Sequence, residues 1–260
     1  MDEGRPRNRP PLRLAPVPLV DRDRQVIVIW SPKSACTTTY VWFSHLCGFG
    51  HELDDYRGRV HAHHLHVYRK SSRYSASVAA DTGGYHVVRI IRDPYIRAVS
   101  IFRYALITHY ADSSLAEAGL DFEKGISFRT FLEFLARIDM RRANIHYRPQ
   151  LHPLERERKP DTVINITKSD MFAALNALEA RMNWPHTDFP GMAWLHEYEG
   201  GRKARSDPFD GADLDLLPLV RSRRIRHSPF PTYDQLLTPA ARRDIEAIYA
   251  ADFEAYRDYL

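Results

Sequence analysis

The stretch SPKSACTTT, residues 31–39, combines one lysine with a run of small hydroxyl side chains directly after the apolar segment QVIVIW. If a helix begins here, its first backbone N–H groups and Lys33 together attract an anion. The alternative is a capped helix beside a solvated lysine, because short patterns of this kind are common. The pattern GxxxxGK[ST] is missing, and Lys33 stands at the front of the turn, which disfavours an ordinary ATP or GTP site.

A second candidate for anion binding is RIIRDPYIRAVS, residues 89–100. Arg92 follows an apolar run, and Ser100 comes two helical turns later, with Arg97 between them. A guanidinium fork matches phosphate oxygens, and a serine hydroxyl adds a donor. Alone, this pattern more often reflects helix capping and surface ion pairs. Two anion sites, each at the end of a strand, indicate a ligand with phosphate groups at two ends.

A third candidate is the histidine-rich stretch GRVHAHHLH, residues 58–66. Its histidines are His61, His63, His64 and His66. In an extended strand the last two face one way and the first two the other, so a three-histidine zinc site does not follow from the pattern, and we expect no metal. A polar strand with exposed histidines is the alternative.

The elements that position these residues alternate between strands and helices. Apolar, β-branched runs predict strands at 25–30, 85–91 and 162–166, and each precedes a helical pattern. Asp93 and Pro94 are typical of the second helix start, and Ser169 or Asp170 of the third. Such alternation predicts an α/β fold with a parallel sheet and helices on both faces. We expect the polar stretches 111–125 and 183–213 to be surface loops, and 238–260 to form one amphipathic helix.

Composition limits the class of protein. Residues 1–20 alternate Pro with Arg and predict a flexible arm, whereas residues 21–260 suffice for a single domain. The net charge of +4 and the lack of a reading module argue against nucleic acid. No apolar run approaches the roughly 20 residues of a membrane span. The cysteines, Cys36 and Cys47, are too few for a disulfide framework, which favours a reducing, cytoplasmic compartment. Cys36 lacks a C-x5-R or Cys-His-Asn pattern, which favours a loop-filling role over a nucleophile.

With SPKSACTTT and RDPYIRAVS in this order, the sequence resembles the PAPS-dependent sulfotransferases (PAPS is 3′-phosphoadenosine 5′-phosphosulfate), especially the carbohydrate-type, family 2-like branch. The resemblance implies a P-loop-like central parallel sheet flanked by helices. It also implies transfer of a sulfuryl group from PAPS to an acceptor hydroxyl of a carbohydrate, lipid or small natural product, leaving adenosine 3′,5′-bisphosphate. Many soluble members carry glycine in the loop, where this chain has Ala35 and Cys36.

The resemblance also implies roles for particular residues. The 5′-phosphosulfate loop comprises Lys33, Ser34, Ala35, Cys36, Thr37 and Thr38. The 3′-phosphate is held by Arg92 and Ser100, and a late loop adds Arg226 and Ser228. Apart from the resemblance, the stretch 146–153 offers His146, Arg148 and Gln150 for contacts with an acceptor or cofactor, and the alternative is an ordinary loop. The acceptor proton passes to a base, for which we favour His64 and His66, with Glu52, Asp54 and Asp55 as rivals.

Two other functions fit the same motifs. A kinase-like phosphotransferase would use the loop after the first strand with ATP and Mg²⁺. A non-catalytic nucleotide-binding protein would hold the bisphosphate nucleotide without turnover. The oligomeric state does not follow from the sequence.

Overall fold

The computed structural model describes residues 12, 14–200, 209, 211, 213–221 and 230–260, without the side chains of 197–200. The chain divides into two compact units. The first comprises Met1–Ile91 and Gln150–Phe189, and the second comprises Arg92–Pro149 and Pro190–Leu260, each within its described residues. None of the helices in these described ranges is both long and apolar enough to cross a membrane.

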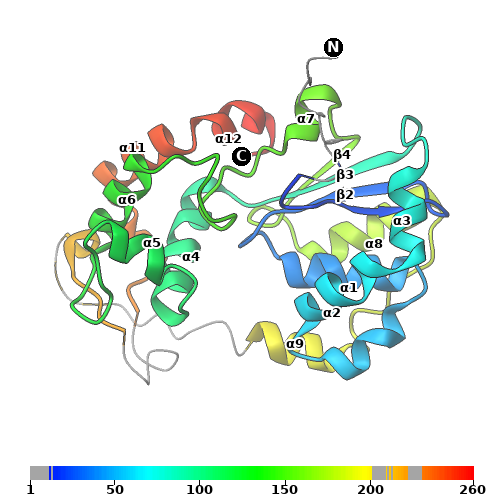
Figure 1. The fold of residues 1–260 in the computed structure, drawn as a ribbon, viewed down its shortest axis with the longest axis horizontal. Coiled ribbons are helices and arrows are strands. Elements are labelled where there is room, and N and C mark those ends of the chain that lie inside the picture. Colours follow the sequence, from blue (N-terminus) through cyan, green and yellow to red (C-terminus); the bar gives the residue numbers. More distant parts are fainter. Residues whose placement is uncertain (1–11, 13, 201–208, 210, 212, 222–229) are drawn as a thin grey trace, which may run out of the picture. The chain divides into compact units, whose positions relative to one another are not determined.

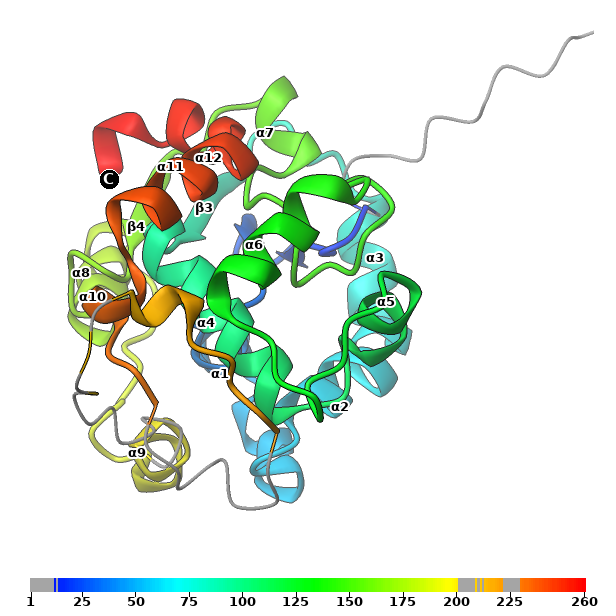
Figure 2. The same ribbon diagram turned by 90° about the vertical axis from the view of Figure 1, so that its left-hand side faces the viewer.

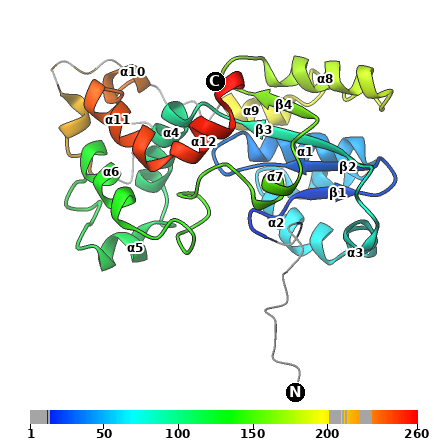
Figure 3. The same cartoon turned by 90° about the horizontal axis from the view of Figure 1, so that it is seen from above.

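A four-stranded sheet forms the centre of the first unit. Its strands, in spatial order, are β1 (Leu19–Asp21), β2 (Val26–Ile29), β3 (His86–Ile91) and β4 (Thr162–Asn165) (Figure 3). β2, β3 and β4 run parallel, as predicted, because VIVI and HVVRII bury almost every side chain. β1 pairs antiparallel with β2, so the sheet is mixed rather than wholly parallel. Its Leu19 and Val20 are buried, although they belong to the segment for which the sequence predicted an arm.

Helices cover both faces of this sheet, with α1 and α8 on one face and α7 on the other (Figure 1). The helices of the first unit are α1 (Cys36–Leu46), η2 (Gly50–Tyr56), α2 (Val60–His66), η3 (Tyr68–Lys70), α3 (Ser72–Ala79), α7 (Pro153–Glu157) and α8 (Met171–Met182). Asp170 caps α8 by accepting a hydrogen bond from Ala173 N at 2.8 Å, as predicted. The predicted histidine strand is wrong: residues 60–66 form α2, because the buried positions Val60, His63 and His64 recur at helical spacing.

The second unit is helical. Its elements are α4 (Pro94–Ile107), α5 (Asp112–Glu117), α6 (Phe128–Arg137), α9 (Ala193–Gly200), η4 (Leu214–Leu216), α10 (Tyr233–Leu236), α11 (Pro239–Ile248), α12 (Ala250–Ala255) and η5 (Arg257–Tyr259). The helices α4, α6 and α11 pack against one another (Figure 2) around a core that includes Phe102, Phe131 and Tyr147. Asp93 caps α4, with Pro94 in its first turn, which confirms the predicted helix start.

Three predicted segments of this part of the chain differ from the structure. The expected loop at 111–125 contains α5 and buries Leu115 and Phe122, since its few apolar residues fall at positions that reach the core. The expected loop at 183–213 contains α9. The expected C-terminal helix is interrupted at Tyr249, whose backbone is not helical (φ −111°, ψ 29°), so α11 ends at Ile248 and α12 follows. The Tyr249 side chain is buried and donates a hydrogen bond to the Tyr147 carbonyl at 3.0 Å.

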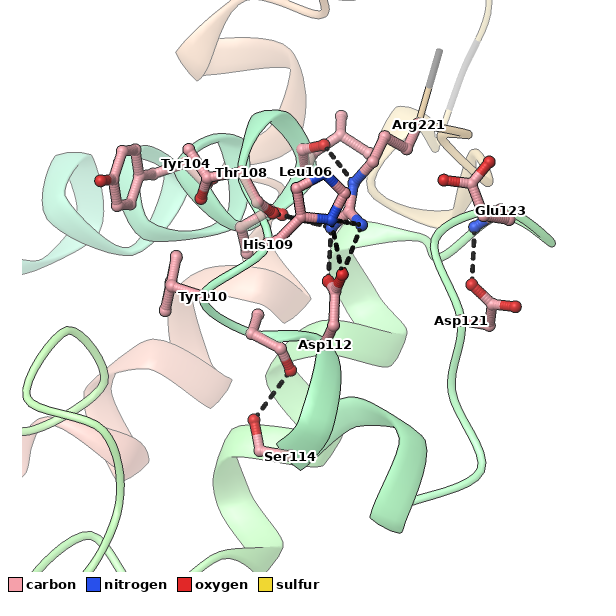
Figure 4. Close-up of polar contacts among 12 residues, drawn as sticks. Tyr104, Leu106, Thr108, His109, Tyr110, Asp112, Ser114, Asp121, Glu123 and Arg221 are labelled. Atoms are coloured by element: carbon pink, nitrogen blue, oxygen red, sulfur yellow. Dashed lines mark hydrogen bonds and ion pairs between the residues drawn. The ribbon is translucent and has the colours of Figure 1, made fainter. Parts of the chain in front are cut away.

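Arg221 closes the C-terminal end of α4 (Figure 4). Its guanidinium donates to the carbonyls of Ala105 (3.0 Å), Leu106 (3.0 Å) and Thr108 (2.8 Å). It also binds both carboxylate oxygens of Asp112, at 2.7 and 2.8 Å. The hydrogen bonds from this guanidinium are the main reason that the pKa of Asp112 lies below its ordinary value. A single side chain therefore joins the end of α4 to the start of α5.

Candidate functional site

The loop between β2 and α1 has an unusual backbone. Lys33 and Ala35 both lie in the left-handed region, with φ angles of 68° and 53°. This conformation costs a residue with a side chain about 1–2 kcal/mol, and glycine usually occupies it. Ala35 immediately precedes Cys36, the first residue of α1, and provides no side-chain cap. The first N–H groups of the helix therefore face the loop, as an anion-binding turn requires.

The hydroxyl groups of the loop have different hydrogen-bond partners. Ser34 is fully buried, and its Oγ donates to Oε1 of Gln150 at 2.7 Å, so this hydroxyl holds the loop from inside the protein. Thr39 Oγ1 donates back to the Ala35 carbonyl at 2.9 Å. Thr37 Oγ1 lies 3.2 Å from Nε2 of His61, and Thr38 is buried in the first turn of α1. The sequence analysis grouped the Ser34 hydroxyl with those of Thr37 and Thr38. In the structure the Ser34 hydroxyl is instead bound to Gln150 inside the protein.

A buried arginine lies beneath the loop. Arg89 stands on β3 opposite Ile29 and is fully inaccessible to solvent. Its guanidinium donates to Ser31 Oγ at 2.9 Å and to the backbone carbonyl of Gln150. Its Nε lies 3.2 Å from Oε1 of Glu155, whose side chain is also buried. The charge of Arg89 is thus compensated inside the unit and is not directed at solvent.

Cys36 and His61 form a close pair at the start of α1. Cys36 Sγ lies 3.5 Å from Nε2 of His61, and the thiol is partly exposed. Burial alone would raise the pKa of this thiol. The charge and hydrogen bond of His61, together with Lys33, outweigh burial and lower the pKa to about 7. At Cys47, by contrast, burial raises the pKa of the thiol well above its ordinary value.

The histidines of α2 have four different environments. His61 is half-buried beside Thr37 and the loop. His63 is buried between the Tyr40 hydroxyl, 2.7 Å from its Nδ1, and Glu52, 3.1 Å from its Nε2. His64 packs among the rings of Trp30, Tyr40 and Tyr68, and its Nε2 makes no hydrogen bond within the described residues. His66 is exposed.

These environments change which histidine is placed for chemistry. Burial lowers the pKa of His64 to about 3, which makes its imidazole a weak base. The structure places His61, rather than His64 or His66, beside the loop. The sequence analysis named His61 among the four histidines but favoured His64 and His66, although the spacing did not distinguish among the four. In a helix, residues three apart such as His61 and His64 share one face, and this spacing would have identified the pair. No group of three or more histidines, cysteines or carboxylates in the described part of the chain is arranged to hold a metal ion.

The carboxylates proposed as rival bases lie before α2. Glu52 is engaged by His63, with its side chain 44% exposed. Asp54 pairs with Arg57 at 2.8 Å on the surface, and Asp55 is exposed.

The second motif lies in the second unit. Arg92 is partly buried, and its guanidinium stands 5.8 Å from the ring centre of Tyr233. Ser100 lies two turns into α4 with 8% of its surface exposed. Arg97 is buried and donates to the carbonyls of His146 (3.3 Å) and Arg148 (2.9 Å), so it supports the chain around residues 146–148.

The remaining predicted contacts are only partly described. His146 Nδ1 is 2.8 Å from Asn144 Oδ1, and Arg148 donates to the Ala143 carbonyl at 2.8 Å. Gln150 belongs to the first unit, where its Oε1 accepts the hydrogen bond from the Ser34 hydroxyl. Arg226 and Ser228 lie outside the described residues.

Comparison with protein families gives a match over most of the chain. Neither a search of curated proteins nor a search of solved structures found a match. The model of the sulfotransferase family matches residues 18–259, a range that includes the loop, α2 and the Arg92 motif. Because this match extends over nearly the whole chain, the protein belongs to the sulfotransferase family.

Proposed function

We propose that the protein transfers a sulfuryl group from PAPS to the hydroxyl of a carbohydrate, lipid or small natural product. The observation that carries this proposal is the left-handed backbone of Lys33 and Ala35, which immediately precedes the start of α1. Family membership supports sulfuryl transfer, and the two anion-binding motifs favour a donor with phosphate groups at both ends.

In this proposal the 5′-phosphosulfate binds Lys33 and the backbone of residues 34–36, with the hydroxyl groups of Thr37 and Thr38 nearby. The 3′-phosphate binds Arg92 and Ser100. In the chain the loop follows β2 and the Arg92 motif follows β3, and β2 and β3 are neighbouring parallel strands. Arg226 and Ser228 remain predictions for closing contacts with the nucleotide.

The reaction proceeds by in-line displacement at sulfur. The acceptor oxygen forms the new S–O bond while the bond to the bridging phosphate oxygen breaks, and a base takes the hydroxyl proton. Lys33 and the N-terminus of α1 stabilise the negative charge that develops on the departing phosphate. We infer that His61 is the base, because its Nε2 lies beside Thr37 at the loop. His64, His66 and the carboxylates become the alternatives.

The test measures transfer of labelled sulfate from PAPS to a panel of hydroxyl acceptors, with adenosine 3′,5′-bisphosphate affinity measured by calorimetry. Lys33→Ala and Arg92→Ala should each lower kcat/KM by about 100-fold or more. Arg92→Ala should also lower the affinity for adenosine 3′,5′-bisphosphate. His61→Gln should lower turnover with little change in nucleotide affinity. Arg142→Ala, at a side chain 92% exposed, is the matched control and should behave as wild type.

Other outcomes would contradict parts of this proposal. Transfer with ATP and Mg²⁺ but not with PAPS would favour a phosphotransferase, and tight nucleotide binding without turnover would favour a non-catalytic protein. If His64→Gln or His66→Gln abolishes turnover while His61→Gln does not, the base is not His61.

A further inference from the structure

The loop at residues 31–35 takes its shape without glycine, and two chain segments distant in sequence hold it. Lys33 and Ala35 both have left-handed backbones, and Ser34 lies between them with no exposed surface. The Ser34 backbone N–H donates to the Ser31 carbonyl at 3.2 Å, which closes the turn. Nothing in the intrinsic preferences of lysine and alanine favours this conformation, so its stability must come from contacts.

The first contact is the hydrogen bond between Ser34 and Gln150. Ser34 Oγ donates to Gln150 Oε1 at 2.7 Å, and Gln150 itself is 1% exposed. A hydroxyl buried without an acceptor is strongly disfavoured, so the loop conformation that brings Ser34 to Gln150 gains relative to conformations that do not. This bond acts at the residue between the two left-handed positions.

The second contact fixes both Ser31 and Gln150. Arg89 donates to Ser31 Oγ at 2.9 Å and to the Gln150 carbonyl, and it pairs with Glu155 at 3.2 Å. Glu155 also accepts a hydrogen bond from His152 N at 2.8 Å, so its own position is set by the capping of α7. Arg89 therefore places the start of the loop and the acceptor for Ser34 in one rigid arrangement.

We propose that Gln150 and Arg89 are positioning residues that hold the loop in its anion-binding conformation, a task for which glycine would otherwise supply the backbone freedom. The identity of the anion, the 5′-phosphate of the nucleotide, rests on the proposed function. The positioning itself rests on the contacts of Ser34, Ser31 and Arg89 alone.

The experiment compares Gln150→Met, Ser34→Ala and their double variant by calorimetry with adenosine 3′,5′-bisphosphate and by thermal unfolding. Gln150→Met keeps the length of the side chain and the backbone carbonyl that Arg89 binds, and it removes the side-chain amide that supplies the acceptor Oε1. Each single variant should raise Kd about ten-fold, and the double variant should raise it no further, because all three lack the same bond.

Ser77→Ala is the matched control, since Ser77 is equally buried in the first unit and its Oγ accepts one hydrogen bond, from Arg22 N at 3.1 Å. It should lower Tm by a similar amount and leave Kd unchanged. The proposal is overturned if Ser77→Ala raises the Kd for adenosine 3′,5′-bisphosphate as much as Ser34→Ala does. It is also overturned if Gln150→Met binds this nucleotide with wild-type Kd.

A glycine variant separates this inference from the proposed function. Ala35→Gly should raise the Tm of wild type more than it raises the Tm of Gln150→Met, because the left-handed strain that glycine relieves persists only while Gln150 holds the loop. An equal gain in both backgrounds overturns the inference. If wild type binds no bisphosphate nucleotide, the proposed function fails while this comparison of Tm values still decides the inference.

Discussion

At the residue scale, the thiol of Cys36 is sensitive to its neighbours in the loop and in α2. Its thiol is the first side chain of α1, and the neighbouring His61 and Lys33 favour the thiolate. Since the pKa is lowered to about 7, a large share of the thiol is ionised at neutral pH, and the thiolate is the reactive form. Cys47 lies on the far end of the same helix, buried and with a raised pKa. The two cysteines of the chain therefore differ sharply in expected reactivity.

Alkylation with iodoacetamide tests this difference. Above pH 7 Cys36 should be labelled readily, and the rate should fall as the pH drops below about 7, because the thiolate takes up a proton. His61→Gln should move the midpoint upward toward the ordinary thiol value of 9.0, and bound adenosine 3′,5′-bisphosphate should slow labelling. Cys47→Ser is the control and should label as wild type. Equal labelling of both cysteines by mass spectrometry would contradict the pairing with His61.

At the scale of elements, the sequence predicts the starts of helices most clearly. Asp93 and Asp170 each cap the helix that the sequence assigned to them, because a short acceptor side chain before an apolar pattern is a local signal. The end of α4 has no such signal. Its carbonyls are bound by Arg221, more than 100 residues away in sequence, so no local reading could have found it.

Replacing Arg221 should therefore destabilise the second unit. Arg221→Met keeps an apolar stem over Phe122 but removes the donors to three carbonyls and the partner of Asp112. We expect the free energy of unfolding to fall by about 2–3 kcal/mol in urea titrations, since a largely buried guanidinium and its bonds to three carbonyls are lost. Arg141→Met, at a side chain 94% exposed, should change it by less than about 0.5 kcal/mol. Equal effects of the two substitutions would contradict the role of Arg221.

At the scale of the whole molecule, buried histidines make the fold sensitive to acid. Burial lowers the pKa of His64 to about 3 and that of His152 to about 4. An unfolded chain binds protons at these histidines near pH 6.5, whereas the folded chain does not. These two histidines therefore leave the free energy of unfolding unchanged above pH 6.5. Below pH 6.5 they lower it progressively as the pH drops.

His64→Phe should reduce this sensitivity, because phenylalanine can occupy the cluster of Trp30, Tyr40 and Tyr68 without titrating. Between pH 7 and pH 5, wild type should lose about 2 kcal/mol more than His64→Phe in urea titrations. His66→Phe alters an exposed residue of the same helix and should follow wild type. An unchanged dependence on pH in His64→Phe would show that this imidazole is not buried in solution.

The sequence was most informative where the signal is local. The strands VIVI and HVVRII, the α/β class and the family motifs all depend on residues close together in the chain. β1 was missed because three residues carry too little pattern, and α2 was missed because alternating histidines imitate a strand. The partners of Ser34 and Arg89 lie far away in sequence, and only folding shows that Gln150 meets Ser34 or that His61 meets Thr37.

The hydrogen bond from Ser34 to Gln150 also has a consequence for the order in which the protein folds. It joins residues 116 positions apart, and the contact of Ser31 with the same residue spans 119. Contacts at such separation form late, after the loss of chain entropy has been met by other interactions. During synthesis, β2 and α1 emerge well before residue 150 exists. The loop therefore gains its left-handed conformation only when the second segment of the first unit joins the first, so an incomplete chain should be unable to form the proposed anion site.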